Sequence, residues 1–201
     1  GVNFALGPLV FRLHFAKPFD IGANPIEAVT RSTGDWALRF LLITLAVTPL
    51  RRLTGWGKLM RLRRMLGLFA FFYATLHVLS YGILDQCLDW SAIGSDILRR
   101  PYITVGVFTY GLLLPLAITS THGMQRRLGG RRWQRLHRLV YLASVLGVLH
   151  FFLLVKADTR EPLIYAALVL VLLGYRLLHA GRDRPGHPGG REKPPVGDRR
   201  G

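Results

Sequence analysis

The chain has 201 residues, half of them hydrophobic, and carries a formal net charge of +16 from 27 Lys and Arg against 11 Asp and Glu. The apolar residues form blocks and the Arg residues lie between the blocks, which is the segregation that a bilayer requires. This pattern argues against a nucleic-acid-binding surface, on which basic and aromatic residues interleave. The single cysteine, Cys87, excludes an intramolecular disulfide and a thiolate metal cluster.

Five apolar blocks predict transmembrane helices, because roughly 20 apolar residues cross a bilayer. The first block is short unless Arg39 lies within it and snorkels to an interface. Residues 2–15 are apolar but interrupted by Arg12, and since the chain begins at Gly1 we expect the truncated end of a further helix there. The predicted fold is an all-α polytopic transmembrane bundle of five full spans plus a truncated N-terminal one. The five spans are Trp36–Leu50, Met65–Leu84, Ile103–Ser120, Leu139–Val155 and Pro162–Leu178.

The loops are of two kinds by charge. The loops after the first and third blocks carry six cations each and no acid, whereas the other loops hold most of the acidic residues. Positive loops stay in the cytosol, so we predict a multi-pass bacterial inner-membrane protein with basic loops and C-terminus cytosolic. We divide the chain into a remnant of the first helix and a periplasmic loop (1–35), a membrane domain (36–180) and a disordered cytosolic tail (181–201). The tail is rich in Gly, Pro and Arg.

Two histidines, His77 and His150, lie inside apolar spans, where an ionisable side chain usually faces a partner or a cofactor. Each lies 12 residues past the cytosolic start of its span, at Met65 and Arg138, or about 18 Å at ~1.5 Å per residue. The two therefore sit at equal depth on helices of like direction. Two imidazoles at one level can ligate a haem iron from opposite faces. The alternative is that each buried ring bonds a neighbouring hydroxyl or carbonyl.

His137 lies 13 residues before His150, about 20 Å nearer the cytosol. An ideal helix would point the two side chains about 140° apart, so aiming both at one column of cofactors requires a twist or bend. The matching level on the other helix holds Arg63 and Arg64, which suit an anionic ligand such as a flavin phosphate. His137 is alternatively an interfacial histidine of a basic loop, or a partner of His122. We give His14, His179 and His187 no ligand role.

Several stretches resemble the MsrQ family, over about residues 20 to 180, and the stretches that carry histidine are the most specific. They are Gly22-Ala23-Asn24-Pro25, Ser32-Thr33-Gly34, Thr48-Pro49-Leu50, Arg63-Arg64-Met65-Leu66-Gly67, Ala74-Thr75-Leu76-His77, Arg100-Pro101-Tyr102, Thr119-Ser120-Thr121 and Trp133-Gln134-Arg135-Leu136-His137-Arg138-Leu139-Val140-Tyr141-Leu142. The family is similar to the ferric-reductase-like transmembrane domains of NADPH oxidases. The resemblance implies that residues 36–180 form a ferric-reductase-like, haem-binding transmembrane domain.

The resemblance implies an electron-transfer subunit with haem b and FMN as cofactors. The family's three histidine positions correspond to His77, His137 and His150. His77 and His150 would hold the haem iron, and His137 with Arg63 and Arg64 would form an inner site for flavin or a second haem. Electrons would come from the quinone pool or a cytosolic flavin reductase. They would pass to MsrP, a periplasmic molybdopterin reductase that repairs methionine sulfoxide in oxidised proteins. Substrate reduction would then belong to that partner, and no catalytic residue is expected here.

Two other classes of function fit the same helices. One is a cofactor-free transporter that uses its histidines as a proton or metal path, and the other is a passive membrane anchor. Neither would have a visible chromophore, so an absorption spectrum separates both from the haem protein.

Overall fold

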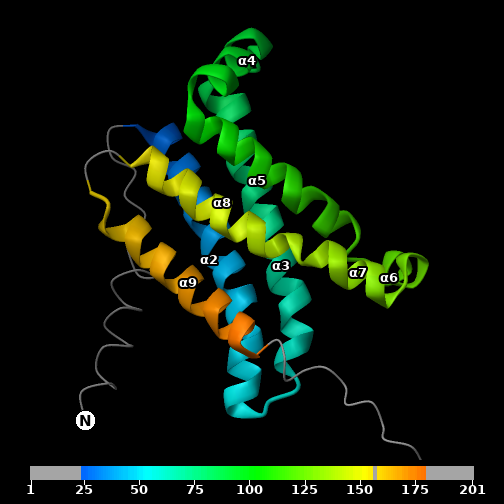
Figure 1. Cartoon of the computed structure of the whole chain (residues 1–201). Coiled ribbons are helices and arrows are strands. Elements are labelled where there is room, and N and C mark those ends of the chain that lie inside the picture. The colour runs from blue at the N-terminus through cyan, green and yellow to red at the C-terminus, as the bar shows by residue number, and fades with distance from the viewer. Residues whose placement is uncertain (1–23, 156–157, 180–201) are drawn as a thin grey trace, which may run out of the picture.

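The computed structural model describes residues 24–155 and 158–179, which form a bundle of helices (Figure 1). The expectations for residues 1–23 and for the tail, with His14 and His187, lie outside these ranges. Five long helices build the bundle: α2 (Pro25–Thr54), α3 (Leu59–Leu79), α5 (Pro101–Ile118), α8 (Leu139–Leu154) and α9 (Arg160–His179). The π-helical turn η1 (Ser80–Asp85) continues α3, and three shorter helices are α4 (Trp90–Arg99), α6 (His122–Leu128) and α7 (Gly130–His137).

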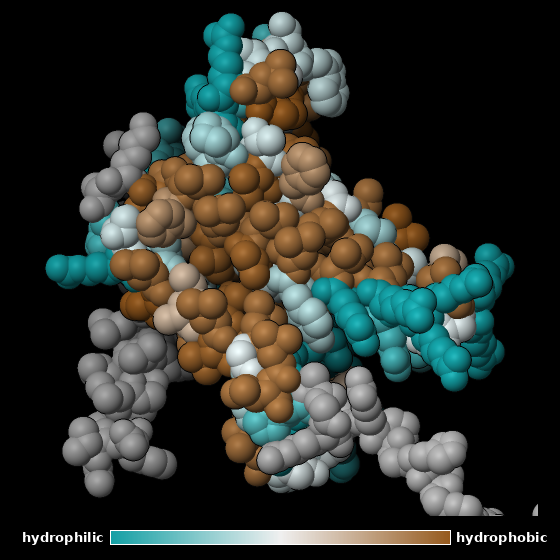
Figure 2. Space-filling view, in the orientation of Figure 1, coloured by the Kyte–Doolittle hydropathy of each residue, from teal (hydrophilic) through white to brown (hydrophobic). Residues whose placement is uncertain are grey.

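The prediction of an all-α polytopic membrane bundle is confirmed. In the described part of the chain, four helical segments are long and apolar enough to cross a membrane. They are Leu59–Asp85, Pro101–Ile118, Gly130–Leu154 and Arg160–His179. Figure 2 shows a broad hydrophobic face over the middle of the bundle, with hydrophilic residues at its extremities. Large apolar side chains such as Phe108, Leu170 and Val171 are about two-thirds or more exposed, at 67%, 71% and 68%, which suits contact with lipid.

The helix that contains the first predicted span is longer than the apolar block from which the span was predicted. Helix α2 has 30 residues and begins at Pro25, where the Asn24 side chain accepts a hydrogen bond from the Glu27 N–H. An Asn cap followed by Pro is a strong start signal, and it outweighs the polar composition of residues 25–35. The helix therefore begins 11 residues before the predicted span start at Trp36, and the proposed boundary between residues 35 and 36 falls inside it.

Arg39 joins two helices of the bundle. It lies in the middle of α2, largely covered, and its Nε donates to the Tyr165 hydroxyl of α9 over 3.2 Å. Its guanidinium also stacks on Trp36 with 5.1 Å to the ring centroid and lies 4.0 Å from the Asp35 carboxylate. These partners hold the charge between helices, and the expectation of snorkelling stays a prediction.

Small residues allow the central helices to approach closely. Ala70 and Ala74 of α3, and Ala143 and Ser144 of α8, are buried among leucines of α2 and α5. In lipid, close packing of small residues replaces the hydrophobic drive that stabilises soluble cores. The Ser144 hydroxyl, which is fully buried, donates to the Val140 carbonyl of its own helix. The core thus holds α3 and α8, the two helices with half-buried histidines, in one bundle.

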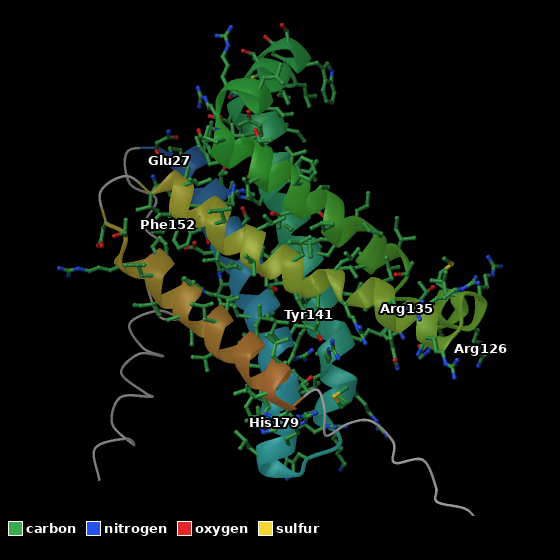
Figure 3. The ribbon with its side chains drawn as sticks, viewed as in Figure 1. Glu27, Arg126, Arg135, Tyr141, Phe152 and His179 are labelled. Carbon is green, nitrogen blue, oxygen red and sulfur yellow. The ribbon has the colours of Figure 1, made fainter. Side chains whose placement is uncertain are left out.

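The two ends of the bundle differ in charge. The basic end comprises the α2–α3 turn, helices α6 and α7 and the end of α9, and Figure 3 shows Arg126 and Arg135 on the α6–α7 arm. The acidic end comprises the starts of α2, α5 and α9 together with η1 and α4. Helix α4, which the sequence did not predict, uses two of its carboxylates internally. Asp89 caps the helix, and Asp96 accepts from Tyr81 and pairs with Arg100.

We predict that the basic end is cytosolic, because positive loops resist translocation. A reporter that is active only in the periplasm should be active when fused after Asp89 and silent when fused after Arg131. Asp89 precedes α4 and Arg131 lies in the first turn of α7, so both fusion points lie outside the five long helices. The opposite activity pattern would invert the orientation.

Candidate functional site

The structure brings the His77 and His150 side chains next to each other as a facing pair, with the rings edge-on rather than stacked. His77 comes from α3 and His150 from α8, and their ring centroids are 6.0 Å apart with the planes at 82°. Both helices run from the basic to the acidic end, so the equal depth expected from residue counting becomes a direct juxtaposition. Neither side chain reaches its partner through a local turn, since 73 positions separate them along the chain.

A backbone carbonyl from a neighbouring helix fixes each of these rings. His77 Nδ1 lies 2.8 Å from the Thr30 carbonyl oxygen of α2, and His150 Nδ1 lies 2.6 Å from the Tyr102 carbonyl oxygen of α5. A carbonyl only accepts, so Nδ1 carries the proton in both rings. The Nε2 lone pair of each ring is then available to a metal, and the carbonyl bond sets the ring orientation.

A glycine makes room for each ring. A Cβ on Gly34 would lie 3.1 Å from His77 Nδ1, and one on Gly106 would lie 2.9 Å from His150 Nδ1. Each glycine stands four residues after the carbonyl that holds the ring, so glycine and carbonyl occupy one face of the helix. A larger residue at either position would push the imidazole away from its acceptor.

The site is therefore built from two copies of one arrangement. In the pair α2 and α3, glycine and carbonyl lie on the first helix and the histidine on the second, and the pair α5 and α8 repeats this. No internal repeat is evident in the sequence, and the correspondence appears only in space. Sequence reasoning found both histidines but missed Gly34 and Gly106. An isolated glycine inside the α5 span was the available signal, since glycine there weakens a helix without a packing reason.

The alternative expectation was that each buried histidine bonds a hydroxyl or a carbonyl, and the structure shows the carbonyl bond for both rings. The carbonyl takes Nδ1, while the nearby hydroxyls have other partners: Thr75 donates to the Phe71 carbonyl and Ser80 to the His77 carbonyl. Two imidazoles that bind one metal from opposite sides, with bonds of about 2 Å, place their centroids about 6 Å apart. The observed spacing fits. A bare ion would be poorly coordinated by two nitrogens, whereas haem iron requires only two axial ligands.

His137 occupies a second, separate position at the basic end. It closes α7, and a single residue in right-handed helical conformation, Arg138, separates α7 from α8. Its Nδ1 donates to the Trp133 carbonyl over 3.1 Å, its ring stacks on Trp133 at 3.8 Å, and its Nε2 lies 3.5 Å from the Ser120 hydroxyl. The Nε2 atom thus faces a weak partner.

The residues predicted around His137 differ in their exposure. Arg63 is half-buried and close enough to interact electrostatically with His137, whereas its neighbour Arg64 is exposed. His122 is exposed at the start of α6. His179 donates to the Tyr175 carbonyl and stacks on that ring, as expected of a histidine without a ligand role.

Comparison with known proteins identifies the domain. Residues 33–148, more than half of the chain, match the family described as ferric reductase like transmembrane component. This range contains α3 and α5 entire and includes His77 and His137. No solved structure matches the chain.

Similar proteins share one description, "Protein-methionine-sulfoxide reductase heme-binding subunit MsrQ". The protein of Rhodospirillum rubrum is 62% identical over 82% of this chain and 79% of its own length. The proteins of Herminiimonas arsenicoxydans and Azospira oryzae are each 54% identical, over 85% and 83% of this chain and 79% and 73% of their own lengths. The chain therefore belongs to the MsrQ family, within the ferric reductase like transmembrane proteins.

Proposed function

We propose that this chain is the haem-binding electron-transfer subunit of a methionine-sulfoxide reductase system in a bacterial inner membrane. The observation that carries this proposal is the facing pair His77 and His150, each ring with Nδ1 on a carbonyl and Nε2 available. The relatives are described as heme-binding subunits of such a reductase, and two axial histidines are what a b-type haem requires.

His77 and His150 would hold haem b, which supplies reversible one-electron chemistry near the acidic end. The chain's own contribution is position and basicity. The Thr30 and Tyr102 carbonyls accept hydrogen bonds from Nδ1–H, which makes the opposite nitrogens better donors to iron. Both rings come from the apolar helices α3 and α8, and such an apolar setting influences the reduction potential of a haem.

We place the electron-accepting side at His137 and Arg63, with FMN as the inner cofactor and Arg64 as an exposed cation beside it. A flavin accepts electron pairs and releases single electrons, so it suits a donor such as a quinone or a cytosolic flavin reductase. The positive charge at the basic end supports an anionic cofactor there. A second haem on His137 would need a further ligand, and the Ser120 hydroxyl lies 3.5 Å from His137 Nε2.

The electron acceptor that we propose is MsrP, a periplasmic molybdopterin-dependent reductase of methionine sulfoxide in oxidised proteins. It would meet the acidic end of the bundle, closest to the histidine pair. Reduction of the sulfoxide would occur in that partner. The rival class, a cofactor-free histidine-lined transporter, is tested by the visible spectrum of the purified protein with haem and flavin quantified per chain. If the purified protein were colourless and moved protons or metal ions, the transporter hypothesis would replace our proposal.

The axial ligands are tested by single substitutions. His77→Ala and His150→Ala should each abolish or severely reduce haem content, because a single imidazole leaves the iron without its second ligand. The purified wild type should show a low-spin b-type spectrum. His122→Ala and His179→Ala, on exposed or locally bonded rings, should retain the wild-type haem content. An unchanged low-spin spectrum in either of the first two variants would exclude the assignment.

The glycine contacts predict a steric effect without loss of a ligand. In Gly106→Ala the new methyl group would lie 2.9 Å from the His150 ring. Overpacking of this kind typically destabilises a protein by about 1–3 kcal/mol. We expect weaker haem retention and a shifted spectrum. Gly111→Ala, on the same helix, is the matched control, because a Cβ at that position meets nothing within 4 Å. Equal haem retention by the two variants would show that the close approach is not needed.

The inner position predicts a separation of the two cofactors. His137→Ala should weaken flavin binding or electron uptake from the donor while the low-spin haem remains, because His137 lies 13 residues before His150, nearer the basic end. Flavin release and haem absorbance of one preparation measure both. Complete loss of haem in a folded His137→Ala protein would show that His137 is an axial ligand instead.

A further inference from the structure

A pair of arginines at the basic end has no counter-charge in the part of the chain that the structure describes. Arg176, near the end of α9, donates to the Tyr141 hydroxyl of α8 and to the Thr48 hydroxyl of α2. Its guanidinium also lies over the Tyr141 ring, 5.0 Å from the centroid. Arg63 of α3 lies within electrostatic reach of both Tyr141 and Arg176. Arg176 thus joins α9 to α8 and α2, and Arg63 brings α3 to the same cluster.

The acidic residues that the structure describes are all remote from this cluster. They lie at the opposite end, in the first half of α2, in η1 and α4, and at the start of α9: Glu27, Asp35, Asp85, Asp89, Asp96, Asp158 and Glu161. The partners of Arg176 are neutral hydroxyls, and its Nε is buried without a hydrogen-bond partner among the described residues. Figure 3 shows Tyr141 on α8 near its α7 end and His179 at the end of α9.

Two cations held together inside a membrane protein destabilise each other unless an anion joins them. The donors around them also suit an anion. Thr48 and Tyr141 each accept a hydrogen bond from Arg176, so their own hydroxyl hydrogens remain available to donate. Guanidinium groups match the tetrahedral oxygens of phosphate with two parallel hydrogen bonds each.

We propose that Arg63, Arg176, Tyr141 and Thr48 form a binding site for the phosphate group of a ligand at the basic end. Arg176 and Tyr141 come from helices beyond the arginine motif of α3, so the site is assembled only in the folded bundle. His137 lies beside it, within electrostatic reach of Arg63. The phosphate has two sources in this setting: FMN, whose presence rests on the function proposed above, and the headgroup of an anionic lipid.

The test uses the full chain, purified with its haem in nanodiscs of phosphatidylcholine. FMN and riboflavin, which share the ring system and differ in the phosphate, are titrated and followed by quenching of flavin fluorescence. We expect FMN to bind about ten- to a hundredfold more tightly than riboflavin, the effect of hydrogen bonds to a charged group. Arg176→Gln and Arg63→Gln should abolish that preference, and Tyr141→Phe should reduce it. Arg61→Gln removes an exposed charge of the same helix and should preserve it.

A second arm distinguishes the lipid source. The same proteins are placed in nanodiscs of mixed phosphatidylglycerol and phosphatidylcholine, and native mass spectrometry measures which lipid is retained. Retention of phosphatidylglycerol that Arg176→Gln and Tyr141→Phe weaken, without preference for FMN, assigns the site to a lipid phosphate. Absence of both effects in wild type overturns the proposal. Haem absorbance recorded on each sample keeps the outcomes apart, because a haem-loaded protein without phosphate binding refutes this site alone.

Discussion

The hydrogen bond from an imidazole Nδ1 to a backbone carbonyl of the adjacent helix is the interaction on which the histidine pair depends. Without it, each ring could rotate about its side-chain bonds, and Nε2 would have no defined direction. The bond requires the ring to lie against the helix backbone, and therefore requires glycine one turn after the acceptor. One hydrogen bond thus ties together the packing of each ring, its tautomer and the direction of Nε2. Each of the two helix pairs contains this arrangement once.

The position of this histidine pair separates two kinds of site along the length of the bundle. The imidazoles lie toward the acidic end, whereas the uncompensated cations and His137 lie toward the basic end. His137 lies 13 residues before His150 in the continuous segment Gly130–Leu154, so the two histidines lie at different levels of the bundle. In the proposed function this polarity gives electrons a direction, from an anionic cofactor at one face to the facing histidines near the other.

Charged residues inside the bundle show how neighbours decide a residue's role. Arg39 has Tyr165, Trp36 and Asp35 around it and serves to join α2 to α9. Arg176 has hydroxyls and a second cation around it, and we assign it to a ligand. Desolvation is costly for both guanidinium groups. An internal carboxylate offsets that cost for Arg39, and the site at Arg176 leaves the offset to an external anion.

The sequence by itself determined the helical membrane bundle, the opposite charge of its two ends and the depth of His77 and His150. These properties follow from hydropathy and from a constant rise per residue, both of which can be counted along one chain. Only the tertiary structure decided the start of α2, the carbonyls and glycines behind the rings, and the separation of Arg63 from Arg64. It also brought Arg176 and Tyr141 to Arg63. Such contacts depend on how each helix is rotated against its neighbours, and that rotation results from side-chain packing between segments distant in the chain.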